Sequence, residues 1–388
     1  MADESAKGPL HGVRILDLTT FIFGPYATQT LGDLGADVIK VEGPEGDPQR
    51  PTAKAAKNPE MGSIFMALNR NKRSVVLDLK AEADRARLHA LVPTAQVFIH
   101  NVRADAAQRL GFDYDTIAKL NPSIVYVHCV GYGSDGPYAG RQAFDDLVQA
   151  ASGAADLLPR VDGNPEKRLI PSYIADKVSG LHAVYAVLAA LFHRERTGQG
   201  QFVEVPMLES FTSFLLTEHL AGATFEPPVS HMGYTPALTA DRKALKTKDG
   251  YIALQSPSRA ASAKFMELGG IPNAYESERF VNAPGSKGKV AAYYAMARDA
   301  ALAHTTDEWM ALGVEHRIPI MRANSLEEVL TDPHLKAVDF FQLREHKSEG
   351  PWRAMKPPIR FAKTPASIRR DPPRTGEDGE TVLETPKS

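Results

Sequence analysis

Residues 12–131 alternate between short apolar runs and segments with helical spacing, and this alternation restricts the fold more than any other feature. Each run has the length and the β-branched, apolar character of a buried strand. Strands joined by helices pair in parallel, because the crossover returns the chain to the same edge of the sheet. The sequence therefore predicts an α/β fold with a Rossmann-like, doubly wound parallel sheet that binds ligands at the carboxyl ends of its strands. The predicted strands are 12–18, 36–42, 74–79, 97–100, 124–131 and 201–205.

The spacing of apolar residues changes along the chain and divides it into domains. Helical patterns dominate after residue 137, and the longest covers residues 174–196. Pro227 and Pro228 then indicate a linker, and the stretch that follows has a less regular pattern. We predict a large Rossmann-like domain over 1–225, a smaller α+β domain over 226–325, and a C-terminal segment over 326–388.

The composition excludes several classes of function. The 45 basic and 47 acidic residues leave a net charge of −2, which argues against general binding of nucleic acid or of anionic membranes. The single cysteine, Cys129, excludes an internal disulfide and a thiolate metal cluster. The 12 histidines lack the spacing of metal ligands, so we expect no metal site.

No segment has the character of a membrane span or of a secretion signal. The longest uninterrupted apolar run, residues 183–192, is shorter than the roughly 20 residues that cross a bilayer. Residues 1–10 lack the apolar centre of a signal peptide. We therefore expect a cytoplasmic protein without a membrane partner.

The glycines after the first predicted strand do not form a dinucleotide-binding motif, and two other common motifs are absent from the chain. The chain has no GxxxxGK[ST] loop and no GxSxG turn, and Gly24, Gly32 and Gly35 do not follow the GxGxxG spacing. A Rossmann-like unit without these glycines is expected to bind a ligand other than a dinucleotide.

Several collinear segments resemble class III CoA-transferases, the CaiB/BaiF family, a superfamily that includes formyl-CoA transferases and 2-methylacyl-CoA racemases. The segments are 13–19, 23–25, 34–42, 68–74, 77–79, 101–103, 109–111, 131–133, 136–138, 174–176, 193–198 and 328–334. Each alone is unspecific, but together they cover nearly the whole chain. The resemblance implies a large Rossmann-like domain assembled from both chain ends, a small inserted domain, and an interlocked homodimer.

The resemblance implies that Asp176 is a nucleophile that carries CoA between an acyl-CoA and a free carboxylic acid. Residues 172–176 are expected to begin a helix, where backbone N–H groups and the helix dipole favour a carboxylate. A carboxylate can open a thioester, because the mixed anhydride that forms is reactive enough for the CoA thiolate to attack it. The alternative is that Asp176 only caps the helix.

The resemblance further implies that CoA is a substrate, not a tightly bound cofactor, and that two polar segments bind it. Cations and amides there suit its phosphates and adenine, although the charged run 70–73 also suits a solvated turn. The implied CoA-binding residues are Asn69, Asn71, Lys72, Arg73, Asn101, Val102, Arg103 and Arg109, with Arg141 as a further candidate.

Residues 144 and 145 discriminate between reactions. Asp145 matches an acidic residue that related transferases hold near the nucleophile, although a helix cap or salt bridge would suit it equally. The racemases carry a His-Asp pair here, whereas this chain has Phe144, which cannot accept a proton. Racemisation exchanges protons on both faces of the α-carbon, so a transferase is favoured over a racemase or a non-catalytic CoA-binding homologue.

Two departures from formyl-CoA transferases concern the acyl group. Those enzymes carry a glutamine where this chain has Ile22, and their glycine-rich loop corresponds to residues 236–242, which contain no glycine. The expected partners are therefore an acyl-CoA and a carboxylic acid with a larger or less polar acyl group.

Overall fold

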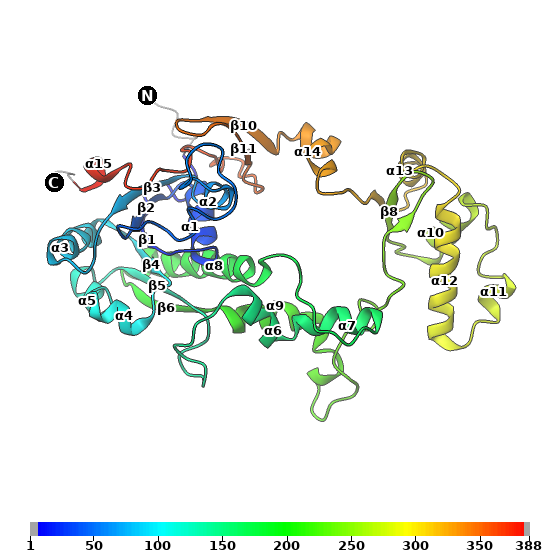
Figure 1. Ribbon diagram of the computed structural model, residues 1–388. Helices are drawn as coiled ribbons and strands as arrows, with labels where there is room; N and C mark the ends of the chain where they lie inside the picture. Colours follow the sequence, from blue (N-terminus) through cyan, green and yellow to red (C-terminus); the bar gives the residue numbers. More distant parts are fainter. Residues whose placement is uncertain (1–6, 384–388) are drawn as a thin grey trace. The chain divides into compact units, whose positions relative to one another are not determined.

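The computed structural model describes residues 7–383, which divide into two compact units (Figure 1). The first unit comprises Met1–Ala155, Arg168–Thr217 and Ala337–Ser388, and the second comprises Asp156–Lys167 and Glu218–Lys336. This division differs from the predicted ranges chiefly at residues 156–167, which group with the second unit.

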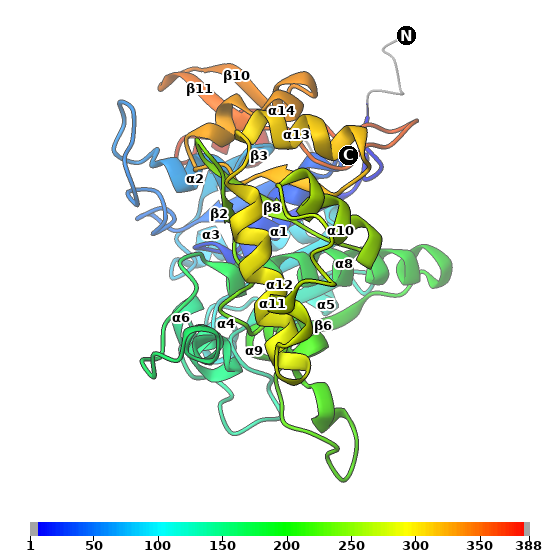
Figure 2. The same ribbon diagram turned by 90° about the vertical axis from the view of Figure 1, so that its right-hand side faces the viewer.

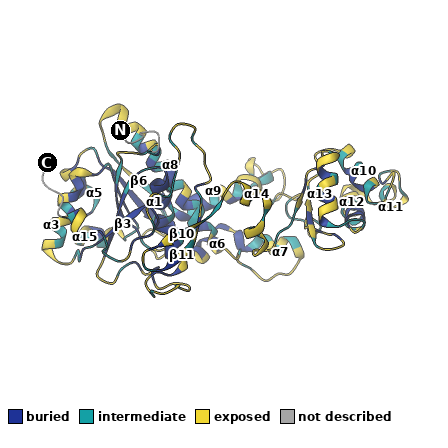
Figure 3. Cartoon of the chain, turned by 90° about the horizontal axis from the view of Figure 1, so that it is seen from above, coloured by how far each residue is buried: buried dark blue, intermediate teal, exposed yellow. Residues whose placement is uncertain are grey.

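A six-stranded parallel sheet forms the centre of the first unit, in the order β3-β2-β1-β4-β5-β6. This is the strand order of the Rossmann fold, and it confirms the predicted α/β class with a parallel sheet. The strands β1 to β5 are largely buried, and Figure 3 shows much of the sheet in dark blue, whereas the edge strand β6 is mostly of intermediate burial. They are β1 (Arg14–Leu18), β2 (Asp37–Glu42), β3 (Lys72–Val76), β4 (Val97–His100), β5 (Val125–Val130) and β6 (Gln201–Pro206).

Helices connect the strands of this sheet. The first, α1, begins at Phe23 and includes Pro25, because a proline in the first helical turn loses no hydrogen bond. The helices are α1 (Phe23–Asp33), α2 (Ser63–Leu68), α3 (Glu82–Leu91), α4 (Ala104–Arg109), α5 (Tyr114–Leu120), α6 (Asp145–Ser152), α8 (Ile174–Thr197), α9 (Met207–His219) and α15 (Gly379–Leu383).

Helix α8 is the longest element and packs against α1, α6, β5 and β6. By length and composition alone it could cross a membrane, although a core helix meets the same criteria. Its residues Leu181, Tyr185 and Phe192 are exposed in the single chain. The predicted absence of a membrane partner therefore stays a prediction.

The C-terminal part of the chain packs on the first unit after a short helix, α14 (Pro333–Ala337). A hairpin of β10 (Phe341–His346) and β11 (Gly350–Met355) follows. Val382 then enters the core beside Val75 and Leu88, and the Asp378 N–H donates to the Ser74 carbonyl oxygen. The chain end thus covers the outer strand of the sheet.

The second unit has its own core and a small antiparallel sheet in the order β7-β8-β9 (Figure 2). Trp309 stacks on Phe265 with ring centroids 4.3 Å apart, and its Nε1 donates to the Ala301 carbonyl oxygen. The elements are α7 (Leu157–Asp162), β7 (Leu245–Lys246), β8 (Tyr251–Leu254), α10 (Arg259–Leu268), α11 (Glu278–Val281), α12 (Gly285–Ala301), α13 (Thr306–Glu315) and β9 (Ile320–Arg322).

Candidate active site

A pocket of about 810 Å³ opens at the carboxyl ends of the central strands of the first unit. The segments that follow β1, β4 and β5 line it, together with the first residues of α6 and α8. The strand order reverses between β1 and β4, and doubly wound sheets bind their ligands at such a point. The pocket therefore lies where the sequence predicted a ligand site.

Asp176 lines this pocket at the third position of α8. The helix begins at Ile174, within the predicted segment 172–176, and the side chain of its N-cap residue, Tyr173, makes no capping hydrogen bond. The backbone N–H of Phe23, at the start of α1, forms a hydrogen bond with the Asp176 carboxylate. Two helix starts thus meet at one carboxylate.

The pKa of Asp176 is raised to about 7. Burial is the largest cause, and the negative charge of Asp145 adds to it. The Phe23 N–H and the charge of Lys177 act in the opposite direction and are weaker. Near neutral pH this carboxyl group is therefore poised between its two protonation states, a property that active-site carboxyl groups often have.

Asp145 orients the start of α8. Its side chain is buried, and its Oδ2 accepts the backbone N–H of Asp176 at 3.0 Å. Its Oδ1 accepts from Gln149 Nε2 at 2.5 Å, and Gln149 also bonds to the backbone of Ile170 and Ser172, just before α8. The structure therefore places both predicted catalytic residues side by side.

The close approach of α1 and α8 depends on Gly180. A Cβ atom at this position would lie 2.9 Å from the Phe23 carbonyl oxygen and 2.9 Å from the Tyr26 ring, closer than packed atoms allow. The missing side chain lets α8 lie directly against the first turn of α1. This packing brings the Phe23 N–H to Asp176.

The loop after β1 is held from two sides. Asn101 Oδ1 accepts the Thr20 N–H at 3.0 Å, and Asn101 Nδ2 donates to the Thr20 carbonyl oxygen at 2.9 Å. Phe21 has a φ of +67°, which is rare for an aromatic residue and is maintained only by surrounding contacts. Asn101 thus joins the loops after β1 and β4 across the point where the strand order reverses.

The segment after β4 lies where the sequence predicted CoA-binding residues. Asn101, Val102 and Arg103 line the pocket, as does Arg141 from the loop after β5. Arg103 and Arg141 are exposed, and Arg141 lies over the Tyr138 ring. Arg109 is not among the lining residues and pairs with Asp105 at 2.9 Å on the surface of α4.

The other predicted CoA-binding segment is engaged within the protein and does not line this pocket. Lys72 is fully buried and contacts Asp17 at 3.1 Å, and Arg73 pairs with Asp37 at 2.5 Å. Asn69 Nδ2 donates to the Phe65 carbonyl oxygen. Asn71 Nδ2 donates to Asp33, and its Oδ1 accepts the N–H groups of Arg369 and Arg370.

The direction of β3 explains this placement. Residues that precede a parallel strand lie at the edge opposite to those that follow it, and β3 begins at Lys72. Asn69 and Asn71 therefore lie at the amino edge of the sheet, whereas Asn101 lies at the carboxyl edge. The roles of Asn69, Asn71, Lys72, Arg73 and Arg109 in binding CoA stay predictions.

An aromatic wall that the sequence analysis did not single out stands beside Asp145 and Asp176. Phe21 and Phe144 pack edge to face with ring centroids 5.9 Å apart, and Tyr173 precedes α8; all three line the pocket and are exposed. The Phe144 ring cannot accept a proton, so that side of the pocket offers no base at residue 144.

A histidine pair was also missed, because His100 ends one apolar run, His128 lies within another, and neither has metal-ligand spacing. Their rings stack at 4.3 Å in the pocket wall, and burial lowers the pKa of both. Cys129 is buried next to them, as predicted for a structural thiol, and burial raises its pKa. Within residues 7–383 no group of three His, Cys, Asp or Glu side chains could hold a metal ion.

Comparison with known proteins identifies the family. Residues 10–379 match the model of CoA-transferase family III. The chain is 30% identical to a succinate–glutarate CoA-transferase of Agrobacterium fabrum, over 97% of this chain and 95% of the relative. It is 31% identical to a "probable fatty acyl-CoA transferase" of Mycobacterium tuberculosis, over the full length of both.

A solved CaiB/BaiF family protein from Brucella suis has the same fold, with a TM-score of 0.84 and 28% identity over 97% of this chain and 99% of that one. The predicted resemblance is thereby confirmed. This chain belongs to CoA-transferase family III, and it is a CoA-transferase.

Proposed function

We propose that this enzyme moves CoA between an acyl-CoA and a carboxylic acid through covalent intermediates on Asp176. The observation that supports this most is the position of a carboxylate with a raised pKa in the pocket at the carboxyl edge of the sheet. A backbone N–H reaches its oxygen, and among the described residues no cationic side chain forms an ion pair with it. A carboxylate in this setting suits nucleophilic attack better than a structural role.

The first half-reaction releases the donor acid. An Asp176 oxygen attacks the thioester carbonyl carbon, the C–S bond breaks, and the CoA thiolate leaves a mixed anhydride behind. The thiolate then attacks the Asp176 carbonyl carbon, which forms an aspartyl-CoA thioester and releases the donor as a carboxylate. The Phe23 N–H contacts the Asp176 carboxyl group, so it is placed to donate to the Asp176 oxygen that gains negative charge when the thiolate attacks the Asp176 carbonyl carbon.

The second half-reaction runs these steps with the acceptor acid. Its carboxylate attacks the aspartyl thioester, the CoA thiolate leaves, and the thiolate then attacks the acceptor's carbonyl carbon in the new anhydride. Acyl-CoA forms and Asp176 is regenerated. Because water would hydrolyse either intermediate, the aromatic wall of Phe21, Phe144 and Tyr173 serves to keep the site dry.

CoA is proposed to bind as a substrate along the loops after β4 and β5. The exposed guanidinium groups of Arg103 and Arg141 suit its phosphates, and the backbone around Asn101 and Val102 suits the neutral parts of the molecule.

The exposed apolar residues Leu181, Tyr185 and Phe192 of α8 support a homodimer, since a soluble enzyme would cover them with a second subunit. A cytoplasmic location and the absence of nucleic-acid partners belong to the same proposal.

Trapping the intermediate tests the mechanism. The protein is incubated with an acyl-CoA and then with hydroxylamine or borohydride, and the modified peptide is identified by mass spectrometry. We expect modification of Asp176 in the wild type, and neither modification nor transfer in Asp176→Ala. Unimpaired transfer by Asp176→Ala would refute the assignment.

Heavy water separates the proposal from the racemase alternative. A transferase leaves the α-hydrogen of the acyl group in place, whereas a racemase replaces it with deuterium. With Phe144 at the position of the racemase histidine, we expect no exchange. Binding of CoA without transfer or adduct would instead indicate the non-catalytic homologue.

A further inference from the structure

Gln49 is a buried amide whose side chain is left without a partner. It lines the same pocket as Asp176 and is only 5% exposed. Among residues 7–383 its carboxamide makes no hydrogen bond, although its backbone N–H does. Its oxygen and nitrogen atoms are not among the fully buried polar atoms that lack a partner, so the carboxamide keeps access to the pocket and is free to bind a ligand there.

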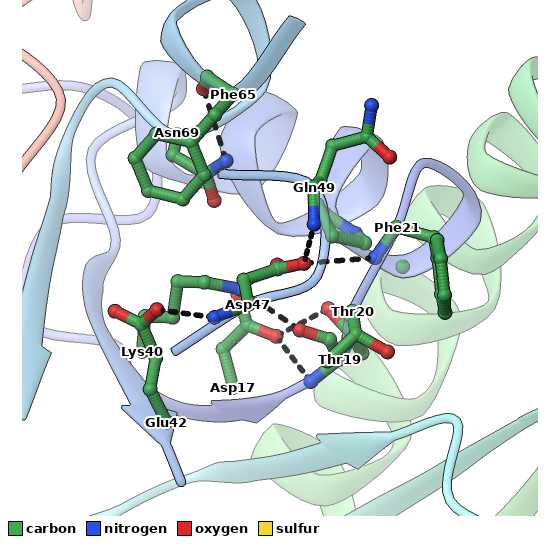
Figure 4. A network of polar contacts seen from close by, with 12 residues as sticks. Asp17, Thr19, Thr20, Phe21, Lys40, Glu42, Asp47, Gln49, Phe65 and Asn69 are labelled. Atoms are coloured by element: carbon green, nitrogen blue, oxygen red, sulfur yellow. Dashed lines mark hydrogen bonds and ion pairs between the residues drawn. The ribbon is translucent and has the colours of Figure 1, made fainter. Parts of the chain in front are cut away.

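The backbone of Gln49 is held rigidly beside the loop that reaches Asp176. Asp47 Oδ1 accepts the Gln49 N–H at 2.9 Å and the Phe21 N–H at 3.3 Å, so one carboxylate oxygen joins the two backbones (Figure 4). Phe23, two residues farther on, gives its N–H to Asp176. Gln49 and Asp176 therefore line one pocket and are joined through a single loop, residues 21–23.

A buried ion pair fixes the position of Asp47, which binds the backbone N–H groups of Gln49 and Phe21. Lys40 Nζ contacts Asp47 Oδ2 at 2.7 Å and donates to the Thr19 carbonyl oxygen at 2.9 Å, and both side chains are fully buried. These contacts use the backbone of residue 49 and leave its side chain free. Figure 4 shows the Gln49 carboxamide pointing away from the atoms that Asp47 binds.

We propose that Gln49 is a specificity-determining residue, whose carboxamide binds an oxygen atom on the acyl group remote from the reacting carbonyl. The neighbouring pocket residues Phe21 and Ile22 are apolar, so an acyl chain that ends in a methyl group leaves the amide unpaired. A chain that ends in a carboxylate, hydroxyl or carbonyl oxygen pairs with it. A site built around such a bond discriminates strongly against a substrate that lacks the oxygen.

This inference rests on the proposed function, and three acids with four carbons test it: succinate, 4-hydroxybutyrate and butyrate. Their kcat/KM values as CoA acceptors are compared for the wild type and Gln49→Leu, which removes the amide and nearly preserves the volume. We expect the wild type to prefer the two oxygen-bearing acids. Gln49→Leu should lose about ten- to hundredfold of that preference, the loss expected for one hydrogen bond.

Two further variants complete the design. Gln49→Glu keeps the shape and adds a negative charge, so it should select against succinate and spare butyrate. Gln199→Leu makes the same change as Gln49→Leu at an exposed residue outside the pocket and should leave all three values unchanged. Thermal melting checks that each variant folds.

The outcomes separate this inference from the mechanism. Gln49→Leu and Gln49→Glu could leave the kcat/KM ratios between the three acids unchanged while acyl-CoA still modifies Asp176. In that case Gln49 does not bind the acyl group, and the mechanism stands. If the wild type forms no adduct on Asp176, both proposals fall. If Gln49→Leu loses the kcat/KM preference for the oxygen-bearing acids but still forms the Asp176 adduct, both the role of Gln49 and the mechanism are supported.

Discussion

Two groups of buried carboxylates in the first unit show how neighbours decide what a carboxylate does. Asp17 lies in the middle of the sheet among cations, whereas Asp176 lies at the edge beside another carboxylate, Asp145. Burial raises the pKa of both. At Asp17 the charges of Lys72 and Lys40, together with hydrogen bonds from Thr19 and Thr28, outweigh burial, and the pKa falls below its usual value. At Asp176 the pKa rises to about 7.

The two carboxylates therefore have different roles: Asp17 stabilises the structure, and Asp176 is available for the reaction. The paired network of Asp17, Lys72, Lys40 and Asp47 is satisfied internally and holds the loop after β1 in place. Figure 4 shows the part of it around Asp17, Lys40 and Asp47. Asp176 lines the pocket, and its raised pKa means that the protein destabilises its ionised form relative to its protonated form. Compensated charges therefore build the scaffold, and the uncompensated one is available for chemistry.

The largest expected effect comes from breaking the paired network. Lys72→Met leaves Asp17 buried without its nearest cation, and such a change costs about 3–5 kcal/mol of unfolding free energy. Urea denaturation measures it. Arg109→Met removes a cation from an exposed pair with Asp105 and should cost no more than about 1 kcal/mol. Equal losses in the two variants would contradict the contrast.

A smaller effect with opposite sign is expected at the active site. The folded-state pKa of Asp176 is about 7 and its usual value is 3.8, so the folded state loses stability as the pH rises between these values. Asp176→Asn cannot ionise and escapes this loss. Its melting temperature should exceed that of the wild type by a few degrees at pH 8, and by less at pH 5. A gap that does not grow with pH would argue against the raised pKa.

The smallest effect sharpens the role of Asp145. Its negative charge contributes to the raised pKa of Asp176, so Asp145→Asn should lower that pKa. The acidic limb of the pH profile of kcat/KM should move to lower pH, because the nucleophile must be ionised. Asp146→Asn removes the same charge one residue away at an exposed position, where solvent screens it, and should shift the limb less. An unmoved limb in Asp145→Asn would show that burial alone acts on Asp176.

Much of the fold and part of the site could be predicted because they depend on residues close together in the chain. Apolar periodicity located all six strands of the parallel sheet, and the start of α8 lies within the predicted segment. Asn101 follows β4 directly, so its place at the carboxyl edge follows from the direction of the strand. Gln49, in contrast, gave no signal, since a glutamine in a loop looks like any solvated residue.

The sequence by itself determined the strands, the helices, the family and the identity of the aspartate at the start of α8, because local spacing and collinear motifs carry that information. Only the tertiary structure decided which charges are compensated. Lys72 of β3 contacts Asp17 of β1, although β2 lies between these strands. Asp145 of α6 contacts Asp176 of α8. Burial and Coulomb interactions depend on distances in space, and those arise only when segments far apart in the chain pack together.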